Sequence, residues 1–231
     1  MTSTLFKCFA VAFTVTVASA QTRNINARLV YFKQSSDDPA TLYCPSATEG
    51  EFTSCTPGSS VEVDQTICPV NAAGKIVFTK TAAADQVVST ASVPAGINEA
   101  ILFFLKNPTS SGTPYQVLVV DESFKALPKG GSYICNLSRS PVRVSIGESK
   151  YELVPGKPVS AKRPEKRDAY NMASLQVVIK DGEAWSPVKN SILRFADTER
   201  YFIIPYFEDG TRPSVKIYKQ VVSDKDKPQA P

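Results

Sequence analysis

The chain has 231 residues and a formal net charge of +4, with 26 Lys and Arg against 22 Asp and Glu. A nucleic-acid-binding protein carries a concentrated basic face, so this near-neutral balance argues against a nucleic-acid partner. The sequence contains no histidine, which excludes Ser-His-Asp and Cys-His catalytic groups and histidine-ligated metal centres. We therefore assign no catalytic residue and expect no cofactor.

The first twenty residues have the pattern of an export signal. Lys7 precedes the apolar run Cys8–Val17, and Ala18-Ser19-Ala20 forms a small-residue cleavage site. This run is shorter than the about 20 apolar residues that span a bilayer, and no later stretch is longer, so no membrane span is expected after cleavage. Cys8 stands at the start of the run, whereas a lipid-bearing cysteine stands at its end. The predicted location is the periplasm, the cell surface or the extracellular medium.

After the signal, short runs rich in Val, Ile, Tyr and Phe alternate with turn residues, which predicts β-strands. Residues 34–74 are predicted to be mostly loop, with a weak strand at Val61–Val63. Glu99–Leu105 is almost entirely apolar and is expected to be a central strand buried on both faces. The other strands predicted before residue 125 are Arg28–Phe32, Lys75–Thr79, Gln86–Val93 and Tyr115–Val120.

Asp121–Gly131 contains Pro128 and a Gly-Gly pair, which indicate a junction between two halves. Tight turns are predicted at Gly147-Glu148, Asp181-Gly182 and Asp209-Gly210. The strands predicted after the junction are Ser132–Leu137, Val142–Ile146, Tyr151–Val154, Met172–Lys180, Ile192–Phe195, Tyr201–Phe207 and Val215–Val221.

The strand Tyr201–Phe207 is apolar on both faces when its residues are assigned alternately, so it is expected to be mostly buried. Pro205 within it favours an edge position or a bulge.

These elements predict an all-β fold, an antiparallel β-sandwich built from two small immunoglobulin-like or sandwich subdomains in tandem. The expected N-terminal subdomain covers 21–125 and contains the cysteine-bearing loop 34–74. The expected C-terminal sandwich covers 126–222, and 223–231 is predicted to be a disordered tail. No internal repeat is evident in the sequence.

Four cysteines remain after the signal: Cys44, Cys55, Cys68 and Cys135. An even number in an exported chain predicts disulfides, and at least one bridge is expected within 44–68, although the spacing leaves all three pairings open. A four-cysteine metal site is the alternative. The short Cys-x-x-Cys spacing of structural zinc is absent, so no metal is expected.

Two regions are candidates for binding. The densest basic cluster is Ala161–Arg167, in which Lys162, Arg163, Lys166 and Arg167 could attract an anionic envelope polymer. A solvated loop explains the same residues. Trp185 lies near a turn and is the aromatic residue most expected to be partly exposed, where it could stack on a sugar ring. The other aromatic residues of the C-terminal half are expected to pack in its core.

The segment from Tyr115 to Ser138 resembles a group of exported bacterial β proteins without assigned function. Their pattern, F-x-x-L-P-x-G-S-Y followed by N-L-S and P-V, corresponds here to Phe124, Leu127, Pro128, Ser132, Tyr133, Asn136, Leu137, Ser138 and Pro141-Val142. Gly130-Gly131 departs slightly from it. The resemblance covers about 115–190 and implies the fold and the compartment, but no site residues. Independently of it, Asn136 and Ser138 are expected to cap the turn into Ser140-Pro141 through side-chain hydrogen bonds.

The sequence therefore predicts an exported, non-enzymatic protein with a structural or interaction role in the cell envelope. Its partner would be an unknown envelope protein or polymer. The first alternative is a module that binds a glycan or another envelope polymer. A carboxylate-based hydrolase is the third hypothesis, with candidate acids Asp181, Glu183, Asp197, Glu199, Glu208 and Asp209.

Overall fold

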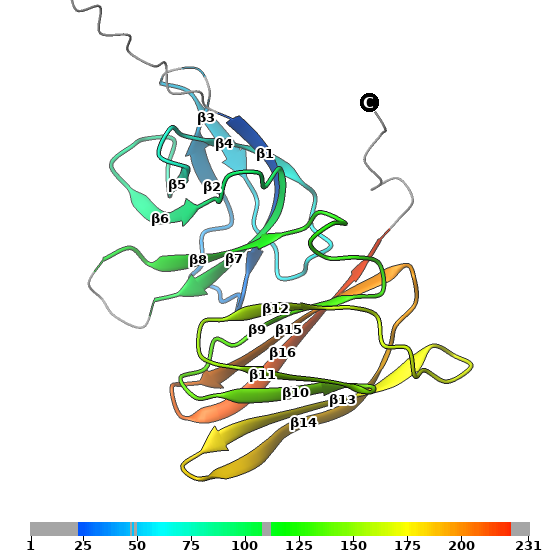
Figure 1. The fold of residues 1–231 in the computed structure, drawn as a ribbon. Helices are drawn as coiled ribbons and strands as arrows, with labels where there is room; N and C mark the ends of the chain where they lie inside the picture. The colour runs from blue at the N-terminus through cyan, green and yellow to red at the C-terminus, as the bar shows by residue number, and fades with distance from the viewer. Residues whose placement is uncertain (1–22, 47, 49, 108–111, 223–231) are drawn as a thin grey trace, which may run out of the picture.

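The computed structural model describes residues 23–222 except 47, 49 and 108–111, so the predicted signal and tail lie outside the described residues. In the described ranges the chain is all-β, as predicted, with sixteen strands in four four-stranded sheets (Figure 1). The strands are β1 Arg23–Tyr31, β2 Leu42–Pro45, β3 Phe52–Cys55, β4 Thr66–Val70, β5 Lys75–Thr79, β6 Val87–Ser92, β7 Glu99–Lys106, β8 Tyr115–Asp121, β9 Ser132–Cys135, β10 Val142–Ile146, β11 Ser149–Leu153, β12 Pro158–Ala161, β13 Met172–Asp181, β14 Ala184–Arg194, β15 Glu199–Glu208 and β16 Arg212–Val221.

The prediction that 34–74 is mostly loop is wrong. This segment contains β2, β3 and β4, whereas the weak strand expected at Val61–Val63 is a turn. The three strands have only four or five residues each and are rich in Thr, Ser, Pro and Cys, so they lack the β-branched and aromatic residues that usually mark a strand. They are held by pairing rather than by their own propensity: β4 pairs with β1, β2 with β5, and β3 with β2.

The two halves of the chain repeat one topology. Sheet A has the order β4-β1-β7-β8 and sheet B the order β3-β2-β5-β6. Adding eight to each strand number gives sheet C, β12-β9-β15-β16, and sheet D, β11-β10-β13-β14. The parallel pair of strands recurs as well, because β1 pairs with β7 and β9 pairs with β15. The expectation that the chain has no internal repeat is therefore wrong at the level of topology.

The four sheets stack as layers in the order B, A, C, D (Figure 1). One apolar core lies between sheets A and B, and a second lies between sheets C and D. A third core joins the halves where Ile101 and Phe103 of β7 meet Phe202 and Ile204 of β15. Both strands are thus buried on their two faces, as their sequences predict. The structure makes the tandem subdomains into one packed unit.

The predicted hairpin turns are confirmed. Gly182 joins β13 to β14 with φ +58°, and Asp209-Gly210 joins β15 to β16 with φ values of +50° and +72°. Two successive residues at positive φ match the twist of the flanking strands, which explains the Asp-Gly pair.

β15 is an inner strand between β9 and β16 and has no register shift, so the prediction of an edge strand or a bulge at Pro205 is wrong for the strand as a whole, although the ladder with β9 ends before Pro205. Pro205 lies two residues beyond Ile203, the last residue of β15 that pairs with β9, and its carbonyl accepts a hydrogen bond from the backbone of Leu137. A proline is tolerated there because β9 offers no further carbonyl that would need a backbone N–H donor at this position.

The predicted cap after β9 is also present. The amide nitrogen of Asn136 donates to the carbonyls of Ser140 (2.9 Å) and Leu153 (3.0 Å), and its side-chain oxygen accepts from the backbone and hydroxyl of Ser138. Asn136 is fully buried, so these groups have no access to water as a substitute.

We expect Asn136→Ala to lower the free energy of unfolding by about 2–3 kcal/mol, because it leaves buried carbonyl and amide groups unpaired. Asn71→Ala is the matched control: Asn71 caps a solvent-exposed turn through Ala73 and Lys75, and its loss should cost about 1 kcal/mol. Urea denaturation of both variants measures the difference. Equal losses would contradict the importance given to burial.

Candidate functional site

A groove of about 610 Å³ opens where the two halves meet. It is lined by Phe32, Lys33, Leu105, Lys106, Leu137, Arg139, Tyr206, Phe207, Asp209 and Gly210. These residues lie at or just after the carboxyl ends of β1, β7, β9 and β15, the strands that form the two parallel pairs. The repeat thus brings equivalent chain segments from both halves to one place. Of these residues, only Asp209 was considered from the sequence, as a candidate acid of the hydrolase hypothesis.

One wall of the groove is aromatic and firmly held. The rings of Phe32 and Tyr206, one from each half, pack edge to face with centroids 5.0 Å apart. The carbonyl of Phe32 accepts hydrogen bonds from Lys216 (2.5 Å) and the hydroxyl of Tyr218 (2.9 Å). Burial, and then the nearby charge of Lys33, lowers the pKa of Lys216. These contacts fix Phe32 in position, so the wall is formed before any ligand arrives.

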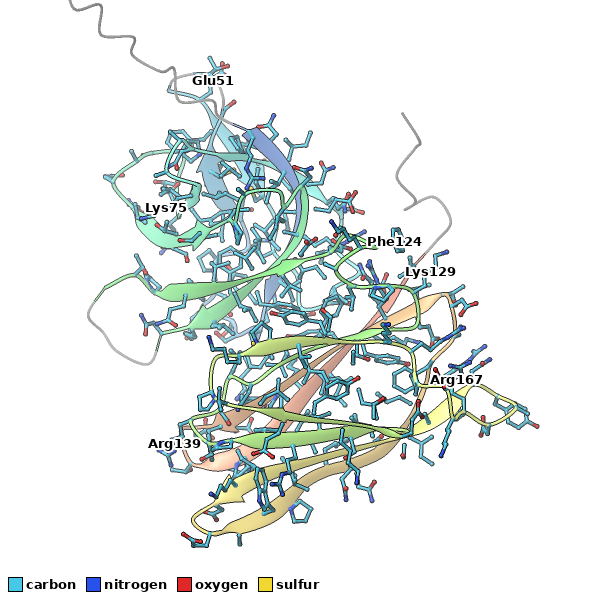
Figure 2. The ribbon with its side chains drawn as sticks, in the orientation of Figure 1. Glu51, Lys75, Phe124, Lys129, Arg139 and Arg167 are labelled. Carbon is cyan, nitrogen blue, oxygen red and sulfur yellow. The ribbon has the colours of Figure 1, made fainter. Side chains whose placement is uncertain are left out.

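Three cations surround the apolar wall. Lys33 lies 4.7 Å above the Tyr206 ring and forms an ion pair of 3.1 Å with Glu208. The guanidinium of Arg139 lies 4.9 Å above the Phe207 ring, and its exposed side chain points outward from the C-terminal half, at the opposite end from Arg167 (Figure 2). In the described ranges Arg139 makes no ion pair with an acid, so its charge is available to a ligand.

The third cation, Lys106, is positioned by a buried acid. Its ammonium lies 3.5 Å from Asp38, which also accepts hydrogen bonds from the Tyr115 hydroxyl and the Ser35 amide, both 2.7 Å. Burial raises the pKa of Asp38, but these hydrogen bonds and the Lys106 charge lower it overall. The carboxylate therefore stays ionised and holds Lys106 at the rim of the groove.

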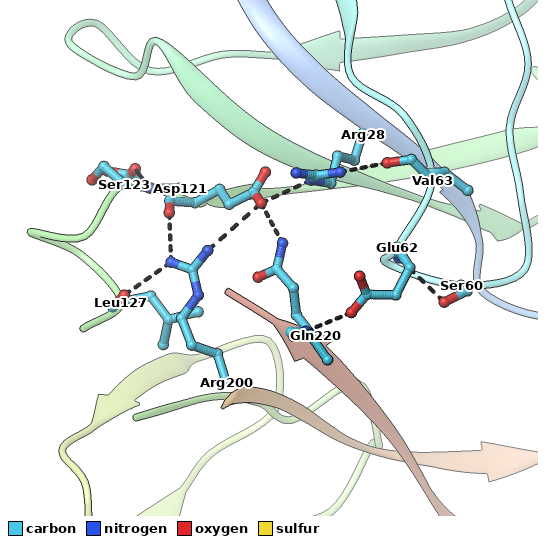
Figure 3. Close-up of polar contacts among 11 residues, drawn as sticks. Arg28, Ser60, Glu62, Val63, Asp121, Ser123, Leu127, Arg200 and Gln220 are labelled. Carbon is cyan, nitrogen blue, oxygen red and sulfur yellow. Dashed lines mark hydrogen bonds and ion pairs between the residues drawn. The ribbon is translucent and has the colours of Figure 1, made fainter. Parts of the chain in front are cut away.

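A buried polar network locks the halves together beside the junction core (Figure 3). The carboxylate of Glu122, which follows β8, lies 2.9 Å from the guanidinium of Arg28 on β1 and 3.6 Å from that of Arg200 on β15. It also accepts a hydrogen bond from the side chain of Gln220 on β16. Arg200 also donates to the carbonyls of Glu122 and Leu127. Since Arg28 and Glu122 belong to one half and Arg200 and Gln220 to the other, the network fixes the relative position of the sheets that form the groove.

The predicted basic cluster is not one continuous charged surface. Arg163 is paired with Asp197, and Arg167 donates to the carbonyl of Pro164 within its own loop. The side chains of Lys162 and Lys166 are exposed. Glu148 accepts hydrogen bonds from the backbone of Glu165 (2.7 Å) and Lys166 (3.0 Å), so an acid lies inside the cluster. Two of its four cations are engaged in holding the loop.

Trp185 is half-buried on β14. The guanidinium of Arg143 lies 3.8 Å from its ring centroid, and Glu152 holds that guanidinium at 2.8 Å. One face of the indole is thus covered by a paired arginine. Trp185 is not among the residues that line the junction groove.

The disulfide prediction is wrong for the described cysteines, which are all free and buried. Cys135 lies on β9 in the C-terminal half, whereas Cys44, Cys55 and Cys68 lie in the N-terminal half. The sulfur atoms of Cys44 and Cys55 are 3.7 Å apart, against about 2.05 Å in a disulfide. The prediction treated 34–74 as a loop that needs a staple, but its three strands are held by sheet pairing and by the core.

The three N-terminal thiols nevertheless form one cluster. Their sulfur atoms lie within 4.8 Å of one another. Hydrogen bonding with Cys55, and then with Cys68, lowers the pKa of Cys44. Hydrogen bonding to Cys44 raises the pKa of Cys55 and Cys68 in turn. Cys44 is therefore the first of the three to ionise.

Several candidate acids of the hydrolase hypothesis are engaged in ion pairs. Asp197 pairs with Arg163, Glu199 lies 3.7 Å from Lys219, and Glu208 pairs with both Lys33 and Arg212. Hydrogen bonds from Lys33 and Arg212 lower the pKa of Glu208. Such a carboxylate is a poor general acid, because that role needs a raised pKa.

Neither a family model nor a curated protein matches the chain. The resemblance to exported bacterial β proteins therefore stays a prediction. The part of the chain that the structure describes contains no helix long and apolar enough to cross a membrane. The fold and the groove define a class of protein. It consists of two β-sandwiches with the same topology, which are joined by a common apolar core and have a groove between them.

Proposed function

We propose that this chain is an exported, non-enzymatic interaction protein that holds an extended segment of an envelope protein in the junction groove. The observation that carries this proposal is the groove itself, an apolar and aromatic surface bordered by Lys33, Lys106 and Arg139. Export rests on the signal pattern of residues 1–20.

The groove selects for a partner with acidic and apolar side chains close together. Phe32, Leu105, Leu137 and Phe207 offer carbon surface, and burial of such surface on binding is favourable. The rim cations attract carboxylates, and Arg139 can engage a carboxylate with two parallel hydrogen bonds. A peptide presents apolar and acidic groups at intervals of about 3.3 Å per residue, which lets one segment reach both wall and rim.

A non-enzymatic role agrees with the chemistry of the groove. Its lining contains one acid, Asp209, which lies in a tight turn, and the chain has no histidine. The neighbouring acid, Glu208, is held by Lys33 and Arg212. The alternative of glycan binding through Trp185 is less favoured, since Arg143 already covers one face of that ring.

The proposal is tested by selecting a random peptide library on the immobilised protein. Recovered peptides are expected to combine Asp or Glu with Leu or Phe. The double substitution Lys106→Glu/Arg139→Glu should weaken their binding at least about tenfold, or about 1.4 kcal/mol. The matched control, Lys180→Glu/Lys189→Glu, reverses two exposed charges on sheet D and should bind as the wild type does.

Two results would overturn this function. One is equal peptide binding by the groove variant and the sheet D control. The other is saturable binding to purified peptidoglycan or anionic polysaccharide with no peptide enrichment, which would support the glycan-binding alternative.

A further inference from the structure

Three cysteines meet inside the core of the N-terminal half. Cys44 lies on β2, Cys55 ends β3 and Cys68 lies in the middle of β4. Strands β2 and β3 belong to sheet B and β4 to sheet A, so the thiol cluster joins the two layers. Each residue is at most 1% exposed. The cluster is separate from the junction groove and does not depend on the function proposed for it.

The spacing of the sulfur atoms suits a shared metal ion. The 3.7 Å between the Cys44 and Cys55 sulfurs exceeds a disulfide bond, yet both atoms can lie about 2.3 Å from one ion, the length of a metal–thiolate bond. All three sulfurs lie within 4.8 Å of one another. Small side-chain rotations therefore bring the third sulfur to the same distance.

The donor set selects the metal. Thiolates are soft ligands that favour Cu(I), Zn(II) and iron–sulfur clusters over hard cations. Structural zinc almost always has four ligands, whereas Cu(I), a closed-shell monovalent ion, is satisfied by two or three thiolates. In the described residues the cluster has three cysteines and no acid or fourth cysteine, and the chain has no histidine to complete it. We propose that Cys44, Cys55 and Cys68 bind a single Cu(I) ion.

The net charge of a buried Cu(I) site stays small when one cysteine keeps its proton. Two thiolates and one retained thiol around Cu(I) leave a single negative charge, and the two displaced protons pass to solvent. A small net charge matters because an uncompensated charge in an apolar core is costly. Cys44 and Cys55 are each followed by an exposed residue, Pro45 and Thr56. Local opening at the ends of β2 and β3 therefore gives the ion access to the cluster.

The test titrates reduced full-length protein, without oxygen, with Cu(I) held by bathocuproine disulfonate, whose coloured complex fades as the protein takes the ion. The wild type is expected to remove one equivalent and to gain an ultraviolet thiolate-to-copper band. Cys135→Ser alters the buried thiol of the other half and should bind as the wild type does. Cys68→Ala should lower the affinity at least about tenfold, and Cys44→Ala/Cys55→Ala/Cys68→Ala should abolish binding.

A variant that is less stable can lose copper binding for that reason alone, so the melting temperature of each variant is also measured with and without Cu(I). One equivalent of Cu(I) should raise the melting temperature of the wild type and of Cys135→Ser, since an ion that binds only the folded state stabilises it. It should raise that of folded Cys68→Ala by clearly less. Copper uptake by the triple variant, no uptake by folded wild type, preference for Zn(II) over Cu(I), or a disulfide among the three residues in natively purified protein would each overturn the proposal.

Discussion

Replacing Glu122 by alanine is expected to lower the free energy of unfolding by about 3–5 kcal/mol, because it leaves buried cationic groups without their partner. The side chain of Arg200 is 3% exposed and that of Glu122 is 4% exposed. Water cannot solvate the arginine after the carboxylate is removed. Chemical denaturation of the variant and of the wild type measures the loss.

The matched control for Glu122 is Glu152→Ala. Glu152 forms an ion pair of 2.8 Å with Arg143, but both side chains are about half exposed, so its loss should change stability by at most about 1 kcal/mol. The double variant Glu122→Leu/Arg200→Met should be more stable than Glu122→Ala alone, since it removes the buried charge of Arg200 together with its partner. Equal effects of Glu122→Ala and Glu152→Ala would falsify this account of the network.

Phe103→Ala is expected to cost about 3–5 kcal/mol, the range for removing a buried phenylalanine side chain, and also to uncouple the two halves. Phe103 is fully buried, and its ring contacts Phe202 and Tyr218 of the other half at centroid distances of 5.9 and 5.1 Å. Truncating it removes part of the core that joins sheets A and C. Unfolding should then separate into two transitions.

The single tryptophan makes this uncoupling measurable. Trp185 lies on β14 in the C-terminal half, so its fluorescence follows that half, whereas far-ultraviolet circular dichroism follows both. The two signals should coincide for the wild type and diverge for Phe103→Ala.

Phe78→Ala is the control for Phe103. Phe78 is equally buried but contacts Phe104 within the N-terminal core. It should destabilise by a similar amount while the two signals stay together. Coincident transitions in Phe103→Ala would show that the junction core does not couple the halves.

The parts of the fold that could be predicted from sequence depend on local patterns. The apolar run of β7 indicates burial on both faces, and it is confirmed because an uninterrupted apolar strand has no face that water can occupy. The Asp-Gly turn between β15 and β16 is confirmed because that pair adopts positive φ at little cost.

The missed strands lack such patterns. β12 and the first half of β14 are half-exposed, with Pro158 or Pro187 in the strand, so neither alternation nor propensity marks them. They form strands because a neighbouring strand supplies the backbone hydrogen-bond partners: β9 pairs with β12, and β13 pairs with β14. Tertiary pairing of this kind leaves no trace in a single sequence.

The groove could not be predicted because its lining comes from four separate chain segments that only the repeat brings together. The sequence does contain part of the groove pattern, since Phe32-Lys33 and Leu105-Lys106 each place a cation directly after an apolar residue at the end of a strand. The cysteine cluster could be predicted only as a group of residues in one region. Their spacing does not reveal that β4 turns Cys68 toward Cys44 and Cys55 across two sheets.

The parallel pairs of strands determine when each half can fold as the chain is synthesised. β1 begins to pair with β7 at Asn26 and Glu99, and β9 pairs with β15 from Ser132 and Tyr201. Neither half can complete its central sheet until its penultimate strand has been made. Such long-range pairing slows folding, so most of each half leaves the ribosome before it can become compact. If the chain is exported as we propose, this delay keeps the polypeptide extended while it crosses the translocation channel.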